Sequence, residues 1–316
     1  MSERTIDTAE RGFDREPVAV AGAGVMGVGI AQVLAIAGHP VRLFDPAASA
    51  RASVSERLAT GCAAADADSA VVGARVTVLD SLEQACAGAA AVIEAGPEDR
   101  ECKREILAAI EASVGDRTLI GTNTSSIPVG ELDGALAHPG RFVGTHFWYP
   151  PYLVPLVEVV KGPRSEPNSV GATIRMLDAA GLRTVRVERD VPGIVGNRLQ
   201  HALKREAIAL VSAGVATAET VDLVVRYGFG RRLALVGPLE QADLGGLDLT
   251  MAIHEVLMPD LDVTRAPHPM LAALVERGDL GAKTGSGFYE WRPGAAERRR
   301  AEIADGLAGR RTVEAP

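Results

Sequence analysis

The stretch VAVAGAGVMGVGIAQVLAIAGHPVRLFD, residues Val18–Asp45, contains a short apolar run, three glycines in a GxGxxG pattern, and then apolar residues at helical spacing. This order predicts a strand, a glycine-rich turn and a helix. Gly22 would permit the tight turn, Gly24 would let the backbone approach a pyrophosphate, and Gly27 would let the helix pack closely on the strand. The turn is therefore typical of a dinucleotide-binding domain. Its predicted cofactor-binding residues are Gly22, Gly24, Val25, Met26 and Gly27.

The acid that ends this stretch indicates which dinucleotide binds. After Gly38 the run VRLF predicts a second strand, and Asp45 follows it, where a carboxylate can accept hydrogen bonds from both ribose hydroxyls. A 2′-phosphate there would meet a like charge. The nearest cations, Arg42 and Arg51, are expected on the strand and in the next helix. The sequence therefore favours NAD over NADP.

Composition predicts a soluble cytoplasmic enzyme of two domains. The chain has 316 residues, 47% of them hydrophobic, and a formal net charge of −8. Such a balance, with only short basic clusters, argues against nucleic acid as a partner. The charged start MSERTIDTAERGFDRE lacks the apolar core of a secretory signal and predicts a flexible leader over residues 1–15. No membrane span is expected. Three distant cysteines, Cys62, Cys86 and Cys102, favour thiols over metal ligands, so no metal is predicted.

Strand and helix signals alternate through about three-fifths of the chain and predict an α/β fold. We expect a Rossmann-like doubly wound sheet domain over 16–190, with a long helix from about Asp99 to Ala112. A smaller all-α domain over 191–293 is expected to begin with a helix near Pro192. Thr217 and Thr220 are capping candidates for a later helix. A charged tail is predicted over 294–316. The expected strands lie at 18–21, 41–44, 74–80, 90–95, 118–123, 141–147, 156–162 and 184–190.

Three stretches place polar residues where ligands bind in such sheets, at the carboxyl ends of the strands. TNTSSIP puts Asn123, Ser125 and Ser126 in a loop, although ordinary turn chemistry also favours these residue types. GTHFWYPPYLVPLVEVV ends one strand on His146 and places Glu158 among valines in the next. A carboxylate buried there is costly unless paired, and a histidine held by it would suit proton abstraction from a hydroxyl. The third stretch, VPGIVGNRLQ, carries Asn197 at an apolar helix start.

These motifs together resemble the 3-hydroxyacyl-CoA dehydrogenase family, close to its short-chain 3-hydroxybutyryl-CoA type, from about Pro17 to Trp291. The shared segments are GAGVMGVGIAQ, EAGPEDRECK, NTSS, HF, LVEVV, VPGIVGNR and GAKTGSGFYEW. The resemblance implies NAD-dependent, reversible oxidation of a 3-hydroxyacyl thioester, such as a CoA thioester, and a homodimer formed through the helical domains. The residue roles that it implies are His146 as general base, Glu158 as its orienting partner, Ser125 and Asn197 as substrate contacts, Glu98 near the nicotinamide, and Lys103 near the thioester cofactor.

One departure leaves the substrate open. Family members usually read HFFNP, whereas this chain reads HFWYP, with Tyr149 in place of the asparagine. A phenol cannot reproduce both functions of an amide. PPYLVPLVEVV also resembles the gulonate and carnitine dehydrogenase branch, which acts on free hydroxy acids, while KTGSGFY favours the thioester branch. A carrier-protein thioester is also compatible with these residues, and so is a non-catalytic NAD-binding protein.

Overall fold

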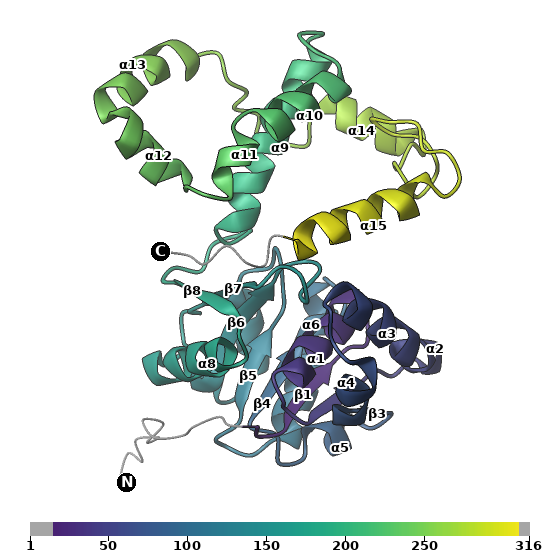
Figure 1. Cartoon of the computed structure of the whole chain (residues 1–316). Coiled ribbons are helices and arrows are strands. Elements are labelled where there is room, and N and C mark those ends of the chain that lie inside the picture. The colour runs from purple at the N-terminus through teal and green to yellow at the C-terminus, as the bar shows by residue number, and fades with distance from the viewer. Residues whose placement is uncertain (1–14, 310–316) are drawn as a thin grey trace. The chain divides into compact units, whose positions relative to one another are not determined.

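The computed structural model describes residues 15–309, and the predicted leader before Arg15 lies outside these residues. The described chain divides into two compact units (Figure 1). The first comprises the residues up to Arg198 together with those from Glu302 onward, and the second comprises Leu199–Ala301. Within residues 15–309, no helix is both long and apolar enough to cross a membrane.

The first unit is built on one eight-stranded sheet, in the order β3-β2-β1-β4-β5-β6-β7-β8. Neighbouring strands are parallel except for β6 and β7, which are antiparallel. The doubly wound α/β fold and all eight expected strands are confirmed. Their bounds are β1 Val18–Ala21, β2 Val41–Phe44, β3 Val76–Leu79, β4 Ala91–Glu94, β5 Leu119–Thr122, β6 Phe142–Phe147, β7 Leu156–Val160 and β8 Arg183–Val187.

Helices cover both faces of this sheet because alternate strand side chains point to opposite faces. Val18 and Val20 of β1 belong to one core cluster, and Ala19 and Ala21 belong to the other. The helices of the first unit are α1 Val25–Ile36, α2 Ala48–Ala52, α3 Val54–Ala64, α4 Ser69–Arg75, α5 Leu82–Cys86, α6 Arg100–Ser113, α7 Val129–Leu132 and α8 Pro167–Ala179, with 3₁₀ turns at Asp133–Ala135 and Pro139–Arg141.

The long helix α6 matches its prediction closely. The Asp99 side chain caps it by accepting a hydrogen bond from the N–H of Cys102 at 2.9 Å. Cys62 and Cys86 are buried free thiols, as expected, and burial raises the pKa of Cys86 to about 11. The Cys86 thiol therefore stays protonated at neutral pH and is a poor nucleophile.

The second unit is helical. Its helices are α9 Gly196–Ser212, which begins in the first unit, α10 Ala218–Tyr227, α11 Gly230–Leu233, α12 Pro238–Gly245, α13 Leu247–Leu257, α14 Pro269–Glu276 and α15 Ala295–Ala308, which ends in the first unit. Thr217 caps α10 through a hydrogen bond from the Thr220 N–H, as predicted.

Two expectations for this region need correction. The helix predicted from near Pro192 begins at Gly196, because Ile194 adopts φ +52° and residues before Gly196 form a turn. The segment after Gly294, predicted only as a charged tail, forms helix α15 as far as Ala308. Its many charged residues are compatible with an exposed helix, and charge alone did not reveal the helical period.

Candidate active site

The glycine turn between β1 and α1 has the shape that a dinucleotide phosphate requires. Gly22 adopts φ +120°, and a Cβ there would lie 2.5 Å from the Ala95 carbonyl oxygen. A Cβ on Gly27 would lie 1.8 Å from the Gly22 oxygen, so α1 can approach β1 only with glycine at that position. A Cβ on Gly24 would meet no atom within 4 Å, which leaves the helix N-terminus accessible to an anion. Val25 is exposed and Met26 is half-buried at this terminus.

Asp45 lies at the end of β2, beside the glycine turn. Its Oδ2 accepts a hydrogen bond from the Ala23 N–H at 2.8 Å, and its Oδ1 accepts one from the Ala47 N–H at 2.8 Å. Arg42 donates to the Ala87 carbonyl, away from Asp45. Arg51, expected farther away, donates to the carbonyl of Asp45 at 2.8 Å. The site therefore presents a carboxylate to a ribose. Besides Arg51, the guanidinium of Arg57 lies at the glycine turn and donates to the Ala23 carbonyl at 2.7 Å.

His146 and Glu158 form the pair that the sequence predicted. They are directly opposed in the antiparallel register of β6 and β7, where facing side chains lie close together. His146 Nδ1 lies 2.8 Å from Glu158 Oε2. His146 is 6% exposed and Glu158 is 1% exposed. When the imidazole is neutral, an Nδ1–H donated to Glu158 leaves the Nε2 lone pair as the available base.

The Glu158 carboxylate also receives hydrogen bonds from the start of α9. Its Oε1 accepts from the N–H groups of Val195 at 3.1 Å and Gly196 at 3.0 Å. Burial raises the pKa of Glu158, but the His146 hydrogen bond, the two N–H groups and the charge on His146 outweigh burial and hold the pKa below its usual value. Glu158 is therefore ionised at neutral pH. Trp148, which no sequence pattern singled out, donates its indole N–H to Glu158 Oε2 at 3.2 Å.

The loop after β5 joins the remaining predicted residues to this pair. Asn123 accepts a hydrogen bond through its Oδ1 from the N–H of Phe147, the residue after His146, at 2.9 Å. Asn197 donates from Nδ2 to the Ser125 carbonyl at 3.0 Å. Asn197 follows Gly196, whose N–H donates to Glu158 of β7. Hydrogen bonds therefore connect β6, β7, the loop after β5 and the start of α9.

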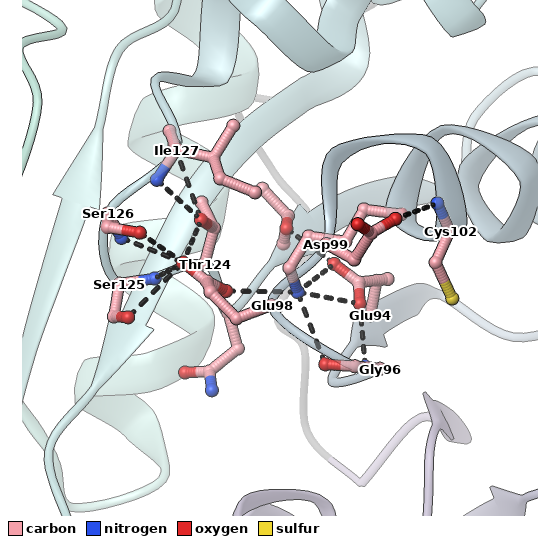
Figure 2. A network of polar contacts seen from close by, with 12 residues as sticks. Glu94, Gly96, Glu98, Asp99, Cys102, Thr124, Ser125, Ser126 and Ile127 are labelled. Carbon is pink, nitrogen blue, oxygen red and sulfur yellow. Dashed lines mark hydrogen bonds and ion pairs between the residues drawn. The ribbon is translucent and has the colours of Figure 1, made fainter. Parts of the chain in front are cut away.

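Glu98 contacts the same loop through its carboxylate, as Figure 2 shows for Thr124, Ser125 and Ser126. Its Oε1 accepts hydrogen bonds from the backbone N–H and hydroxyl groups of both Ser125 and Ser126, and from the Thr124 hydroxyl at 2.8 Å. Burial raises the pKa of Glu98, but the Ser126 N–H, the Thr124 hydroxyl, the Lys103 charge and the Ser125 N–H together lower it to about 2. Glu98 is thus an anion that holds the loop at Thr124–Ser126, called the Ser125 loop below, through hydrogen bonds.

Lys103 is buried in the first unit. The resemblance implied a position near the thioester cofactor, and the Lys103 side chain is 1% exposed. Its Nζ lies 2.9 Å and 3.0 Å from the two oxygens of Glu94, which is 0% exposed, and 3.5 Å from Glu98 Oε2. Lys103 shares the buried face of α6 with Leu107 and Ile110. That spacing of four and seven residues is a signal in the sequence that could have indicated burial.

A glycine turn, an acid at the end of β2 and a histidine–glutamate pair at the carboxyl end of the sheet together define an NAD-dependent dehydrogenase. The comparison with family models agrees. Residues 17–191 match the model of the 3-hydroxyacyl-CoA dehydrogenase NAD-binding domain, and residues 193–291 match that of the C-terminal domain. The chain belongs to the 3-hydroxyacyl-CoA dehydrogenase family. It is an oxidoreductase acting on CH–OH groups, and its cofactor is NAD.

Several relatives are known. The chain is 35% identical to 5-formyl-3-hydroxy-2-methylpyridine 4-carboxylate 5-dehydrogenase of Mesorhizobium japonicum, covering 94% of this chain and 97% of that one. It is 35% identical to a probable 3-hydroxybutyryl-CoA dehydrogenase of Bacillus subtilis, covering 87% and 96%. It is also 38% identical to L-carnitine dehydrogenase of Streptomyces griseus, covering 76% and 72%.

Among solved structures, the fold is similar to that of a 5-formyl-3-hydroxy-2-methylpyridine 4-carboxylic acid 5-dehydrogenase, described as an NAD⁺-dependent dismutase. The TM-score is 0.89 at 31% identity, covering 94% of this chain and 98% of that one. The names of these relatives thus give different substrates.

The geometry at Asp45 predicts the cofactor preference of two variants. The wild-type enzyme should reduce NAD much more efficiently than NADP, and Asp45→Ala should narrow that gap, because a 2′-phosphate would then face Arg51 without a like charge. The ratio of kcat/KM for the two cofactors measures this. Asp45→Ala/Arg51→Ala is the control and should lose the gain with NADP. A wild-type preference for NADP would contradict the assignment of Asp45.

Proposed function

We propose that the protein oxidises the 3-hydroxyl of a 3-hydroxyacyl thioester, with a short-chain 3-hydroxyacyl-CoA such as 3-hydroxybutyryl-CoA as the expected substrate. The reaction is reversible and yields the 3-ketoacyl thioester. The observation that carries the proposal is the 2.8 Å contact between His146 Nδ1 and the ionised Glu158. This contact fixes the imidazole with Nε2 as its base and favours the protonated ring that forms during the reaction.

NAD, which the turn at Gly22–Gly27 and Asp45 would hold, would supply the hydride acceptor when bound. In the proposed mechanism His146 Nε2 takes the hydroxyl proton while Glu158 stabilises the resulting imidazolium. The developing alkoxide needs hydrogen-bond donors. Asn197 gives one amide N–H to the Ser125 carbonyl and keeps a second for the substrate. The Ser125 hydroxyl lies 3.2 Å from Glu98 in this structure and must rotate away from that carboxylate to donate to substrate.

A free hydroxy acid is the second candidate substrate. Lys103, which the resemblance placed near the thioester cofactor, is buried against Glu94 and presents almost no surface to a thioester carrier in this structure. Two of the relatives, the carnitine and pyridine carboxylate dehydrogenases, are named for substrates without a thioester. Tyr149 is 60% exposed directly after Trp148, where it can alter the outer part of a substrate site.

A panel of substrates separates these proposals. NADH formation should be measured with 3-hydroxybutyryl-CoA, its pantetheine and carrier-protein thioesters, free 3-hydroxybutyrate, carnitine and gulonate. We expect the highest kcat/KM with the CoA thioester. A clear preference for a free hydroxy acid would replace the thioester with the second candidate. A chain that binds NADH but oxidises none of these compounds would favour a non-catalytic role.

We infer that the second unit pairs with a second copy of this chain. Among its described residues, Leu274 and Ala296 are the only buried hydrophobic side chains. The helices α12 and α13 carry large apolar residues that are mostly exposed, including Leu239 at 82% and Val256 at 74%. An apolar surface of this extent is typical of an interface. Sedimentation should show a dimer, and Met251→Asp/Val256→Asp should give monomers; a monomeric wild type would contradict the inference.

Removing the charge of Glu158 tests its role beside the base. Glu158→Gln keeps the side chain's shape but no longer favours the imidazolium, so His146 should bind its proton less tightly. Because oxidation needs neutral His146 in the free enzyme, the acid limb of kcat/KM against pH should move to lower pH. The plateau should fall by roughly thirty- to a thousandfold, since losing one partner of a buried pair costs about 2–4 kcal/mol. A folded variant with normal NADH binding, wild-type rate and an unshifted limb would refute the pairing.

A further inference from the structure

Trp148 shares an acceptor with the catalytic histidine. Its indole Nε1 donates to Glu158 Oε2 at 3.2 Å, and the same oxygen lies 2.8 Å from His146 Nδ1. The family motif HFFNP places a phenylalanine at this position, and a phenyl ring has no N–H to donate. Trp148 therefore adds a hydrogen bond to the catalytic pair that the usual family residue cannot make.

The indole is held in place on two sides. Its ring lies against the His146 imidazole, with centroids 5.5 Å apart and planes tilted by 57°. Its six-membered ring also packs on Gly196, where an added Cβ would lie 2.2 Å from the Trp148 Cζ2 atom. Gly196 itself donates its N–H to the other oxygen of Glu158. These packing contacts hold the indole so that its N–H is directed at the Glu158 carboxylate.

We propose that Trp148 is a positioning residue that lowers the proton affinity of the His146–Glu158 pair, so that the base stays neutral at lower pH. A donor on Oε2 takes up part of the negative charge that would otherwise stabilise the imidazolium. Less stabilisation of the imidazolium means weaker proton binding by His146. The consequence for catalysis rests on the proposed role of His146 as the base, whereas the effect on its titration does not.

Other charged groups around the pair have their own partners. On β8, Glu158 lies opposite Val185, and the neighbouring Arg186 points to the other face of the sheet and pairs with Glu188. Arg198 on α9 donates to the Pro192 carbonyl. Glu98 is occupied by the Ser125 loop. The charge of His146 is among the influences that lower the pKa of Glu158.

The test compares Trp148→Phe with Trp291→Phe, since these are the two tryptophans of the chain and Trp291 lies in the second unit. The imidazole resonances of ¹³C-labelled histidine are followed against pH, and His146→Gln identifies the signal of His146. In Trp148→Phe the midpoint of the His146 titration should move upward by about 0.5 pH unit, which corresponds to roughly threefold tighter proton binding. Trp291→Phe should leave it unchanged. The acid limb of kcat/KM should move upward too, opposite to the shift expected for Glu158→Gln.

A second readout needs no change at position 148. In the wild-type protein, the ¹⁵N–H resonance of the Trp148 indole should shift with the same midpoint as His146, while that of Trp291 should not. A folded Trp148→Phe variant with an unmoved or lowered His146 titration would overturn the proposal. A wild-type Trp148 indole resonance that does not shift at the midpoint of the His146 titration would overturn the proposal as well, even if Trp148→Phe fails to fold. Both measurements keep their meaning if no tested substrate is oxidised.

Discussion

His146→Gln should lower kcat/KM by roughly 10²- to 10⁴-fold while leaving NADH affinity nearly unchanged. The loss is that commonly contributed by a general base, about 3–5 kcal/mol in the activation free energy. Glutamine keeps a polar side chain of similar length on β6, but it cannot accept and hold the hydroxyl proton. Steady-state rates with the preferred substrate measure the first effect, and a fluorescence titration with NADH measures the second.

His138→Gln is a matched control, because His138 is exposed and only its backbone N–H is engaged, by Glu111. This control should retain the wild-type rate. Near-normal turnover in His146→Gln would mean that another residue takes the proton. A parallel loss in His138→Gln would instead show that histidine replacement acts on the fold.

Lys103→Met should destabilise the first unit by about 3–5 kcal/mol. Lys103 and Glu94 are both almost completely buried, and removing one partner leaves an uncompensated charge in the core. The Glu94 carboxylate would keep its contacts with the Gly96 N–H at 2.6 Å and the Thr122 hydroxyl at 2.5 Å, which are too few to replace an ammonium. The urea midpoint of unfolding measures the effect.

The double variant Glu94→Gln/Lys103→Met separates charge from packing. It removes both charges and keeps the volume, so it should recover much of the lost stability. A single variant that unfolds at the wild-type midpoint would show that the pair contributes little to the fold.

The strands could be predicted because each is a short, uninterrupted apolar run, and burial on both faces requires such runs in a parallel sheet. β4 and β5 are buried at every position. Glu158 was found for the complementary reason. A carboxylate inside a run of valines is costly unless paired, so its presence indicated a partner before any contact was known.

The unpredicted features depend on contacts between distant elements. The start of α9 at Gly196 is set by a left-handed residue and by N–H groups directed at Glu158, which leave no periodic pattern in the sequence. The indole contact of Trp148 is likewise invisible until β6 and β7 are paired. Lys103 is different. Its helical spacing from Leu107 and Ile110 could have indicated burial, whereas the family resemblance implied a position near the thioester cofactor.

The hairpin of β6 and β7 combines a pair of residues fixed by strand register with a connection whose sequence can vary during evolution. His146 and Glu158, the proposed base and its partner, occupy facing positions of a fixed ladder, where a slip of one residue would send their side chains to opposite faces. The connection from Trp148 to Pro155 lies outside this ladder, so its residues after Trp148 need not keep the register of β6 and β7. Mutations can lengthen this connection or change its side chains while the facing pair on β6 and β7 is retained. A family whose members are named for different substrates is compatible with such a hairpin.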